Sequence, residues 1–398
     1  MPERPELRIV LLTHSVNPRG GVVHTIELAN ALHDRGHHVT VLAPALPGQA
    51  LFRTPRCAVE FVPVAPAPRG IAEMIASRRT AYVAHLSRRL GGQRFDVLHA
   101  QDGIGANALA DLVDAGAIGG FVRTVHHLDH FEDGGVMALQ ERAVRSARLV
   151  LCVSRTWRET LRREFGVSAA LVHNGVDLAR HTRIADASDV RVAARHGLRP
   201  GAPLFLAVGG IEARKNSVRM LQAFIAFHAN RPNAQLVIAG GASLLDHDAY
   251  AREFHALLAA SGLHSGPGEA LVVTGTVPDA DMPALFRAAD ALLMPSVSEG
   301  FGLVVLEALA SDTPAVVSRI APFTEYLSAN EHDDHCCWAD SMSPESIAQA
   351  MGRALAPAHA LALRRRTPRV CEQFSWPASA AAHEALYLRH IAPAGAAA

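Results

Sequence analysis

Two carboxylates in the segment SEGFGLVVLEALASDTP, residues 298–314, have the side-chain type of a sugar-transfer site. Glu299 and Glu307 are eight residues apart across a Phe-Gly turn. Paired carboxylates are the usual acid and base groups for cleaving or forming glycosidic bonds, at separations of about 5 to 9.5 Å. In a continuous helix these two would be about 12 Å apart along the axis. The spacing therefore predicts separate tasks, with Glu299 at a reacting sugar and Glu307 at a distant part of an extended ligand.

Two segments offer backbone amides to an anion. Phe301, Gly302 and Leu303 lie between the two glutamates, where a helix is predicted to begin, and amides at a helix N-terminus attract negative charge. Gly20 and Gly21 join the first predicted strand to a helix expected from about residue 22 to 34. This loop lacks the G-x-G-x-x-G pattern, which disfavours a dinucleotide site. A tight turn without a ligand remains the alternative.

A basic pair precedes another predicted helix in the segment VGGIEARKNS, residues 208–217. Arg214 and Lys215 come just before Asn216 or Ser217, either of which can cap the helix. Two cations beside a helix N-terminus suit a diphosphate group. A solvated basic pair at a helix start is the alternative that the sequence leaves open.

Histidines follow the predicted strand FVRTVH, residues 121–126. His126 ends the strand and can donate to a sugar hydroxyl or stabilise developing charge. It can also be a core histidine, or one ligand of a metal cluster with His127, Asp129 and His130. The segment HDDHCC at 332–337 is a second metal candidate, although a polar loop is favoured for it.

The overall composition excludes several classes of protein. The chain has 398 residues, 49% of them hydrophobic and 19% charged, with no net formal charge. This balance indicates a well-buried globular protein with two domains and disfavours a nucleic-acid binder. Five scattered cysteines indicate free thiols in a reducing compartment. The N-terminal apolar run is too short for a signal peptide or membrane span, so we expect a cytoplasmic protein.

Short apolar segments that alternate with helical patterns must position these loops. They predict parallel sheets with helices on both faces, in two Rossmann-like, doubly wound α/β domains. We expect domains at 1–184 and 185–375, with a C-terminal helix and tail at 376–398. Ligands bind at the carboxyl ends of the strands in such sheets, and in a two-domain version these edges face each other across a cleft. The predicted strands span residues 7–12, 38–43, 58–64, 95–100, 121–126, 147–153, 169–174, 203–210, 234–241, 270–275, 291–296 and 314–318.

These motifs together resemble those of the GT-B glycosyltransferases, and within them the retaining group called family 4. The E-x7-E segment is the most specific part of the resemblance. The segments ARKN, HNGVD (173–177), VLHAQD (97–102), TVHH (124–127) and the early Gly-Gly-x-x-His follow the same pattern in the same order. The resemblance covers nearly the whole chain and implies that the C-terminal helix crosses back onto the first domain.

The resemblance implies roles for the candidate residues. Glu299 would contact hydroxyls of the donor sugar, His126 would lie beside the transferred sugar, and Arg214 and Lys215 would bind the diphosphate. Further donor contacts would come from amides of the two helix N-termini, from a ribose-binding carboxylate and from residues near the base. These are Gly20, Gly21, Phe301, Gly302, Leu303, Glu307, Gly241, Thr276 and Val277. One departure is Gly210, where the family often has an arginine that helps to hold phosphate.

The implied activity is retaining transfer of a hexosyl group from a nucleotide diphosphate sugar to a small-molecule, lipid or glycan acceptor. No cofactor or metal is implied, because the cations and helix N-termini can stabilise the departing diphosphate. Alternatives are a GT-B nucleotide-sugar epimerase, a phosphorylase or a non-catalytic nucleotide-sugar-binding protein. The 69–94 segment carries six arginines and one acid. It is read as a surface helix in preference to a helix that makes weak peripheral contact with anionic lipid.

Overall fold

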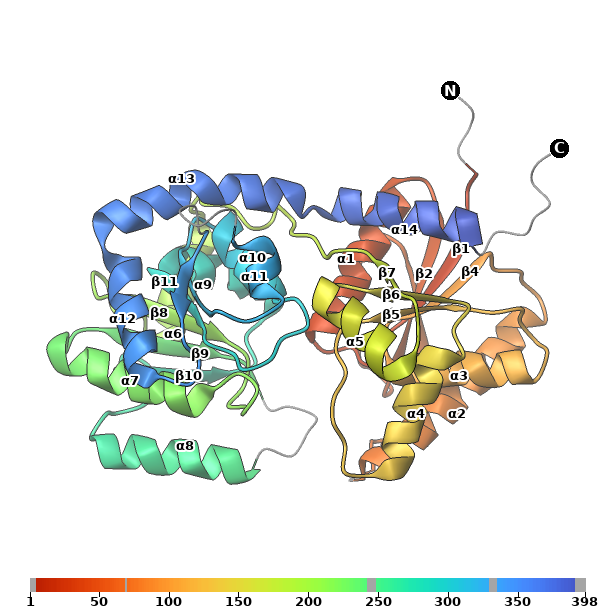
Figure 1. The fold of residues 1–398 in the computed structure, drawn as a ribbon, viewed down its shortest axis with the longest axis horizontal. Helices are drawn as coiled ribbons and strands as arrows, with labels where there is room; N and C mark the ends of the chain where they lie inside the picture. Colours follow the sequence, from red (N-terminus) through yellow and green to blue (C-terminus); the bar gives the residue numbers. More distant parts are fainter. Residues whose placement is uncertain (1–4, 69, 242–247, 329–334, 391–398) are drawn as a thin grey trace. The chain divides into compact units, whose positions relative to one another are not determined.

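The computed structural model describes residues 5–68, 70–241, 248–328 and 335–390. They form two compact units, which are considered separately below. The first comprises Met1–Gly175 and Trp376–Ala398, and the second comprises Val176–Ser375. Each unit is built on a parallel sheet flanked by helices (Figure 1). The predicted fold class of two α/β domains with parallel sheets is thus confirmed.

The first unit contains a seven-stranded sheet in the order β3-β2-β1-β4-β5-β6-β7. The chain moves outward from β1 in both directions, as in doubly wound folds. The strands are β1 (Arg8–Leu12), β2 (His38–Ala45), β3 (Ala58–Pro63), β4 (Val97–Ala100), β5 (Val122–Val125), β6 (Leu149–Cys152) and β7 (Ala170–Leu171). The helices are α1 (Gly20–Asp34), α2 (Ile71–Leu90), α3 (Gly103–Asp114), α4 (Gly134–Arg145), α5 (Arg155–Phe165) and α14 (Trp376–His390).

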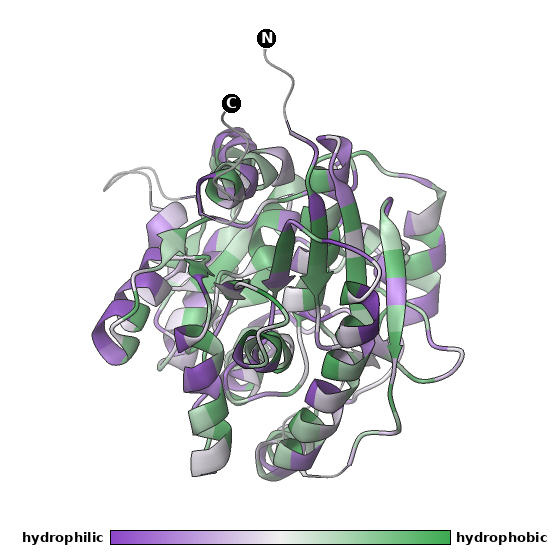
Figure 2. Ribbon diagram, turned by 90° about the vertical axis from the view of Figure 1, so that its right-hand side faces the viewer, coloured by the Kyte–Doolittle hydropathy of each residue, from purple (hydrophilic) through white to green (hydrophobic). Residues whose placement is uncertain are grey.

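Alternation along the strands gives this sheet two different faces. On one face, Leu12 and Ala100 pack in an apolar cluster with Tyr82 of α2, Leu109 of α3 and Ala143 of α4. In Figure 2 the strands are mostly hydrophobic, whereas the helices carry hydrophobic and hydrophilic residues on different sides. The hydrophobic effect therefore fixes α2, α3 and α4 on this face.

The second unit contains a six-stranded parallel sheet in the order β10-β9-β8-β11-β12-β13. Phe224 of α7, Phe254 of α8 and Met351 of α12 pack in the main apolar cluster of this unit. The strands are β8 (Leu204–Val208), β9 (Gln235–Ala239), β10 (Leu271–Gly275), β11 (Ala291–Met294), β12 (Ala315–Ser318) and β13 (Cys337–Ala339). The helices are α6 (Ala187–His196), α7 (Ser217–Asn230), α8 (Asp248–Ser261), the 3-10 helix η1 (Asp279–Asp281), α9 (Met282–Ala288), α10 (Leu303–Ala310), α11 (Phe323–Tyr326), α12 (Pro344–Leu355) and α13 (Pro357–Gln373).

The domain boundary differs slightly from the predicted one. Residues 176–184 lie with the second unit, because Val176 N donates to Phe374 O at 2.9 Å and Arg180 Nη2 donates to Asp279 O at 2.5 Å. The predicted second domain begins with helix α6, which Asp186 caps. The terminal helix α14 belongs to the first unit.

Buried histidines attach α14 to the other face of the first sheet. The ring of His383 on α14 lies 6.1 Å from that of His24 on α1 and 5.8 Å from that of His99 on β4. Tyr387 of α14 forms a hydrogen bond with His99 Nδ1 at 2.7 Å. Burial lowers the pKa of His24 to about 3 and that of His383 to about 4. These rings are therefore neutral near pH 7.

This packing predicts that acid destabilises the first unit. The unfolded chain, with an ordinary histidine pKa of 6.5, binds more protons than the folded one between about pH 6.5 and pH 4. The free energy of unfolding therefore falls as the pH falls through this range. For His383 alone the expected loss between pH 7 and pH 5 is about 2 kcal/mol, measurable by urea unfolding at both values.

The matched variants are His383→Gln, which removes the buried titrating ring, and His390→Gln, which removes an exposed histidine of the same helix. Between pH 7 and pH 5, the free energy of unfolding of His383→Gln should fall by about 2 kcal/mol less than that of the wild type. His390→Gln should show the same fall as the wild type. Identical pH dependence in His383→Gln and the wild type would show that His383 does not titrate in this way.

Candidate functional site

Glu299 lies at the centre of a charged cluster in the second unit. Its Oε1 atom accepts hydrogen bonds from Lys215 Nζ at 2.6 Å and Ser296 Oγ at 3.0 Å, and lies 3.0 Å from Arg214 Nη1. Glu299 is 8% exposed, and Lys215 is the only lysine in the sequence. The structure thus brings together three residues that the sequence predicts as catalytic.

The loops after β8 and β11 hold this cluster in place. Val297 N donates to Arg214 O at 3.0 Å and ties one loop to the other. Asn216 has a left-handed backbone, with φ 61°, and its side-chain amide donates to Pro295 O at 2.9 Å and Ser341 O at 2.7 Å. Asn216 is the N-cap residue of α7, as predicted, but its side chain makes no capping hydrogen bond to the helix backbone. Instead, it stabilises the turn that carries Lys215.

The charges of the cluster depend on one another. Burial raises the pKa of Glu299, but Lys215 and Arg214 outweigh this effect, so its pKa lies below the ordinary value. Burial also lowers the pKa of Lys215, and the nearby Glu299 partly opposes that shift. Glu299 is therefore ionised at neutral pH. An anionic ligand that binds Lys215 has to compete with this carboxylate.

Helix α10 begins at Leu303, as predicted, directly after Gly302. Gly302 has φ +88°, and a Cβ there would lie 2.4 Å from Phe323 Cε1, so only glycine fits. Tyr326 Oη donates to Phe301 O at 3.0 Å and fixes the turn from its other side. This packing sets the orientation of the first amides of α10.

Glu307 lies in the second turn of α10, away from the loop that carries Glu299. Its Oε1 atom is 3.9 Å from Nε2 of His181, which is buried. Sequence reasoning did not single out His181, although it lies just beyond the HNGVD motif. The two glutamates have different polar neighbours, as separate tasks require.

The predicted base-binding residues lie where β9 and β10 end. A Cβ on Gly241 would lie 2.3 Å from Thr276 Oγ1, so these two residues are in direct contact. Val277 follows Thr276 and is buried. The absence of a side chain at Gly241 allows this close approach.

His126 lies at the carboxyl end of β5 in the first unit. Its Nε2–H donates to Gln101 Oε1 at 2.9 Å, and its ring lies 4.4 Å from that of His24. Burial is the largest of the effects that lower the pKa of His126 well below the ordinary value, so its ring is neutral. Gln101 was missed as a site residue, although the predicted motif VLHAQD contains it. The metal-ligand reading of His126 has no support in these contacts.

The two early glycines lie inside a helix and not in a loop before it. Helix α1 begins at Gly20, two residues earlier than predicted, with Arg19 as its N-cap. A Cβ on Gly21 would lie 3.7 Å from His126 Cδ2, so the first turn of α1 lies against the His126 ring. The first amides of a helix have no partner within the helix. Gly20 and Gly21 therefore still present amides at the carboxyl edge of the sheet.

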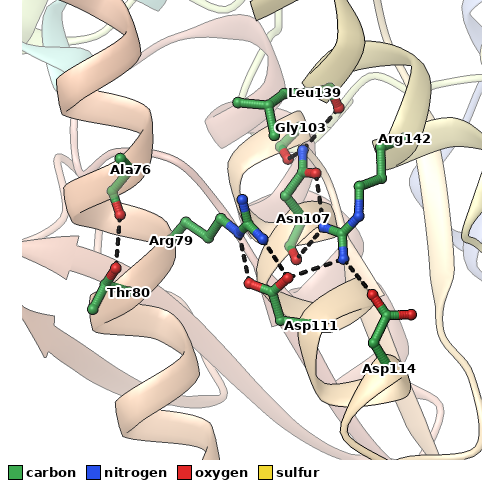
Figure 3. Close-up of polar contacts among 9 residues, drawn as sticks. All are labelled: Ala76, Arg79, Thr80, Gly103, Asn107, Asp111, Asp114, Leu139 and Arg142. Atoms are coloured by element: carbon green, nitrogen blue, oxygen red, sulfur yellow. Dashed lines mark hydrogen bonds and ion pairs between the residues drawn. The ribbon is translucent and has the colours of Figure 1, made fainter. Parts of the chain in front are cut away.

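Three arginines of α2, Arg78, Arg79 and Arg89, bind groups of their own unit. Figure 3 shows Arg79 pointing to Asp111 of α3, where Nε donates to Oδ2 at 2.5 Å, and Arg142 of α4 bound to the same carboxylate. Arg89 pairs with Glu60 at 2.7 Å. These contacts favour a surface helix over a lipid-binding face. Arg69, part of the predicted basic segment, lies outside the described residues.

The two metal candidates do not form clusters in the part of the chain that the structure describes. His127 Nε2 binds Asp129 Oδ1 at 2.7 Å, but no group of three or more potential ligands occurs among the described residues. Residues 332–334 of the second candidate lie outside that part, and Cys337 is in β13. This short edge strand was not predicted. None of the described helices is long and apolar enough to cross a membrane.

Family models match both halves of the chain. The Glycosyltransferase Family 4 model matches residues 18–180, and the Glycosyl transferases group 1 model matches residues 191–366. A GDP-mannose-dependent alpha-(1-6)-phosphatidylinositol dimannoside mannosyltransferase of Mycobacterium tuberculosis is 32% identical over 58% of this chain. That alignment spans 55% of the mannosyltransferase, little more than half its length.

Solved structures share the fold across almost the whole chain. A sucrose-phosphate synthase from Thermosynechococcus elongatus has a TM-score of 0.79 at 20% identity and covers 96% of this chain and 98% of its own. An Anabaena protein in complex with UDP-glucose has a TM-score of 0.75 at 18% identity and covers 96% of this chain and 100% of its own. Such identities establish the fold alone. Together with the family models and the two parallel-sheet units, they show that this chain is a GT-B glycosyltransferase of family 4.

Proposed function

We propose that this protein transfers a hexosyl group from a nucleotide diphosphate sugar to an acceptor with retention of configuration at the anomeric carbon. The observation that carries the proposal is the Glu299 cluster, in which the only lysine of the chain and Arg214 bind one buried carboxylate. Cations held at a fixed position can stabilise charge on a leaving diphosphate, which is the main electrostatic requirement of the reaction.

In the proposed reaction the bond from the anomeric carbon to the diphosphate oxygen breaks, and a bond to the acceptor oxygen forms on the same face. The leaving diphosphate takes the proton of the acceptor hydroxyl. Lys215 and Arg214 stabilise the diphosphate, Glu299 binds sugar hydroxyls and Glu307 binds the ribose. The reaction then uses no protein nucleophile, no metal and no cofactor, because positioning and charge stabilisation carry it.

Relatives whose names or descriptions include a donor support a nucleotide sugar but leave the donor base open. One relative is named as GDP-mannose-dependent, and one structural neighbour is described as bound to UDP-glucose. The relatives named above do not favour an epimerase or a non-catalytic binding protein, since their names describe a transferase and a synthase. In this proposal His126 of the first unit contacts the transferred sugar, and Gln101, which accepts the Nε2–H bond of His126, orients its ring.

Gly210 limits how the second unit can bind phosphate. A Cβ at this position would lie 2.6 Å from Gly241 O and 3.4 Å from Glu212 Oε1. Glu212 is also 3.7 Å from Arg214. The arginine that the family often has at this position does not fit this backbone. We therefore assign the phosphate-binding charge to Arg214 and Lys215 alone.

The cluster predicts opposite effects on donor binding when its two main members are replaced. Lys215→Ala removes a charged contact with phosphate and should weaken nucleotide diphosphate binding about tenfold or more. Glu299→Gln frees Lys215 and Arg214 from their carboxylate, so binding should be retained or strengthened while turnover falls about 100-fold or more. Isothermal titration with UDP, GDP and ADP, followed by turnover with the matching sugar nucleotides, measures both effects.

The control for these variants is Arg158→Ala, which removes one exposed cation of α5 and should leave binding and turnover unchanged.

A third variant, Glu307→Ala, should weaken donor binding with a smaller effect on the chemical step. Unchanged donor affinity in Lys215→Ala would contradict the phosphate role of this residue. A loss of donor affinity in Glu299→Gln as large as that in Lys215→Ala would contradict the competition described above.

The contact at Gly210 predicts a loss of stability when a side chain is added. Gly210→Ala should lower the free energy of unfolding by about 1–3 kcal/mol, because the methyl group meets a backbone carbonyl. Gly352→Ala is the matched control, since a Cβ at this helical position meets no atom within 4 Å. The free energy of unfolding of Gly352→Ala should rise by about 0.5–1 kcal/mol. Urea unfolding compares the two, and equal stability of Gly210→Ala and the wild type would disprove the contact.

A further inference from the structure

Arg123 is a buried guanidinium in the first unit for which the proposed reaction has no use. It lies on β5 and is 5% exposed. Its Nη1 donates to the carbonyl of Thr124, and its buried Nε has no hydrogen-bond partner among the described residues. Within that same part of the chain, no carboxylate forms an ion pair with it. A buried charge without a paired carboxylate is costly, and such groups are common at binding sites.

The sheet register shows which groups share the face of Arg123. In the parallel register, Ala100 of β4 is paired with Leu12 of β1 and with Arg123 of β5. These three side chains therefore project from the same face of the sheet. His14 and Asp102 come two residues beyond Leu12 and Ala100 and extend this row toward the carboxyl end of the sheet. Arg78 reaches the same end from α2, because its Nη1 donates to His14 O at 2.8 Å.

This end of the sheet carries more positive than negative charge. Asp102 is the nearby carboxylate, and its Oδ1 accepts a hydrogen bond from Gly105 N at 2.8 Å as the cap of α3. Burial lowers the pKa of His14, Asp102 opposes that shift, and the charges of Arg78 and Arg123 strengthen it. His14 is therefore neutral near pH 7. Two guanidinium groups lie near one carboxylate, which leaves a net positive charge at a half-buried position.

We propose that Arg78 and Arg123 form an anion-binding site that takes the phosphate group of a phosphorylated acceptor. Guanidinium groups match phosphate oxygens in charge and geometry. The site lies at the carboxyl ends of β1 and β4, since Arg123 is level with the last residues of both strands, and open parallel sheets bind ligands at such ends. Asp102 reduces the cost of burying the two cations before the ligand binds. The identification of the ligand as the acceptor rests on the proposed sugar transfer, whereas the anion site does not.

Inorganic phosphate is the first probe, and Lys215→Ala is the background, because that substitution weakens the proposed phosphate contact of the second unit. We expect the Lys215→Ala protein to bind phosphate in an isothermal titration. Adding Arg78→Gln should weaken this binding about tenfold or more. The matched control is Arg88→Gln, which alters an exposed arginine of the same helix and should leave the affinity unchanged.

Equal phosphate affinity with and without Arg78→Gln would overturn the proposal. Arg123→Gln should weaken binding as Arg78→Gln does, provided that its circular dichroism spectrum shows a folded protein. Because Arg78 is partly exposed and its replacement leaves the core intact, Arg78→Gln decides the question if Arg123→Gln fails to fold.

A second experiment distinguishes the sources of the phosphate. The wild-type enzyme is given sugar nucleotide with glucose 6-phosphate or glucose, and with vesicles of phosphatidylinositol and phosphatidylcholine or of phosphatidylcholine alone. We expect one phosphorylated partner to raise turnover over its neutral counterpart, and Arg78→Gln to reduce that ratio about tenfold or more without changing UDP or GDP affinity. An equal ratio in the variant would overturn the acceptor assignment. Transfer to neutral acceptors alone would also overturn it but would leave the proposed sugar transfer intact.

Discussion

The second unit depends on the sharing of one buried carboxylate by two cations. Glu299 Oε1 binds both Lys215 and Arg214, and each loop that carries these groups is fixed by contacts to the other. Asn216 holds a left-handed turn through carbonyls of two distant segments. A salt bridge that is removed from water is stable only when its geometry is well defined. The ion pair therefore needs the fixed loops that hold its three groups together, and a diphosphate that uses the same cations has to share them with Glu299.

The first unit follows the opposite principle, because its central polar groups are neutral. His24, His99 and His383 are buried without charge and lie between α1, the sheet and α14. Through Gln101, which lies beside His99, the same region reaches His126. Neutral rings can accept or donate hydrogen bonds to sugar hydroxyls without the desolvation cost of a charge. Arg78 and Arg123 differ from these neutral groups, because they give the same unit an excess of positive charge.

The regular part of the fold could be predicted from the sequence. Apolar runs identified every strand except β13, because CWA is a three-residue edge strand with too little periodicity to recognise. The start of α10 near Gly302 was predicted, and the structure adds that the positive φ of Gly302 and its close contact with Phe323 allow no other residue there. The predicted start of α1 was two residues late, because glycines in a first turn resemble a loop in sequence.

The candidate site could be predicted in residue identity but not in contacts. Glu299 and Lys215 were both identified, yet their ion pair joins residues 84 positions apart and depends on the turn at Asn216. Gln101 was overlooked as a partner of His126 for the same reason. The buried state of Arg123 follows from the register of β5 with β4, which a single sequence does not reveal.

The central claim is that the charge of Lys215 is shared between Glu299 and a donor diphosphate. Because Lys215 is the only lysine of the chain, protein labelled with isotopic lysine gives one set of side-chain NMR signals. These signals should titrate with a pKa below the ordinary 10.5 and shift on addition of UDP or GDP. In Glu299→Gln the pKa should fall further, because the carboxylate that favours the charged amine is gone. Titration at the ordinary value, with no response to saturating nucleotide, would contradict the account.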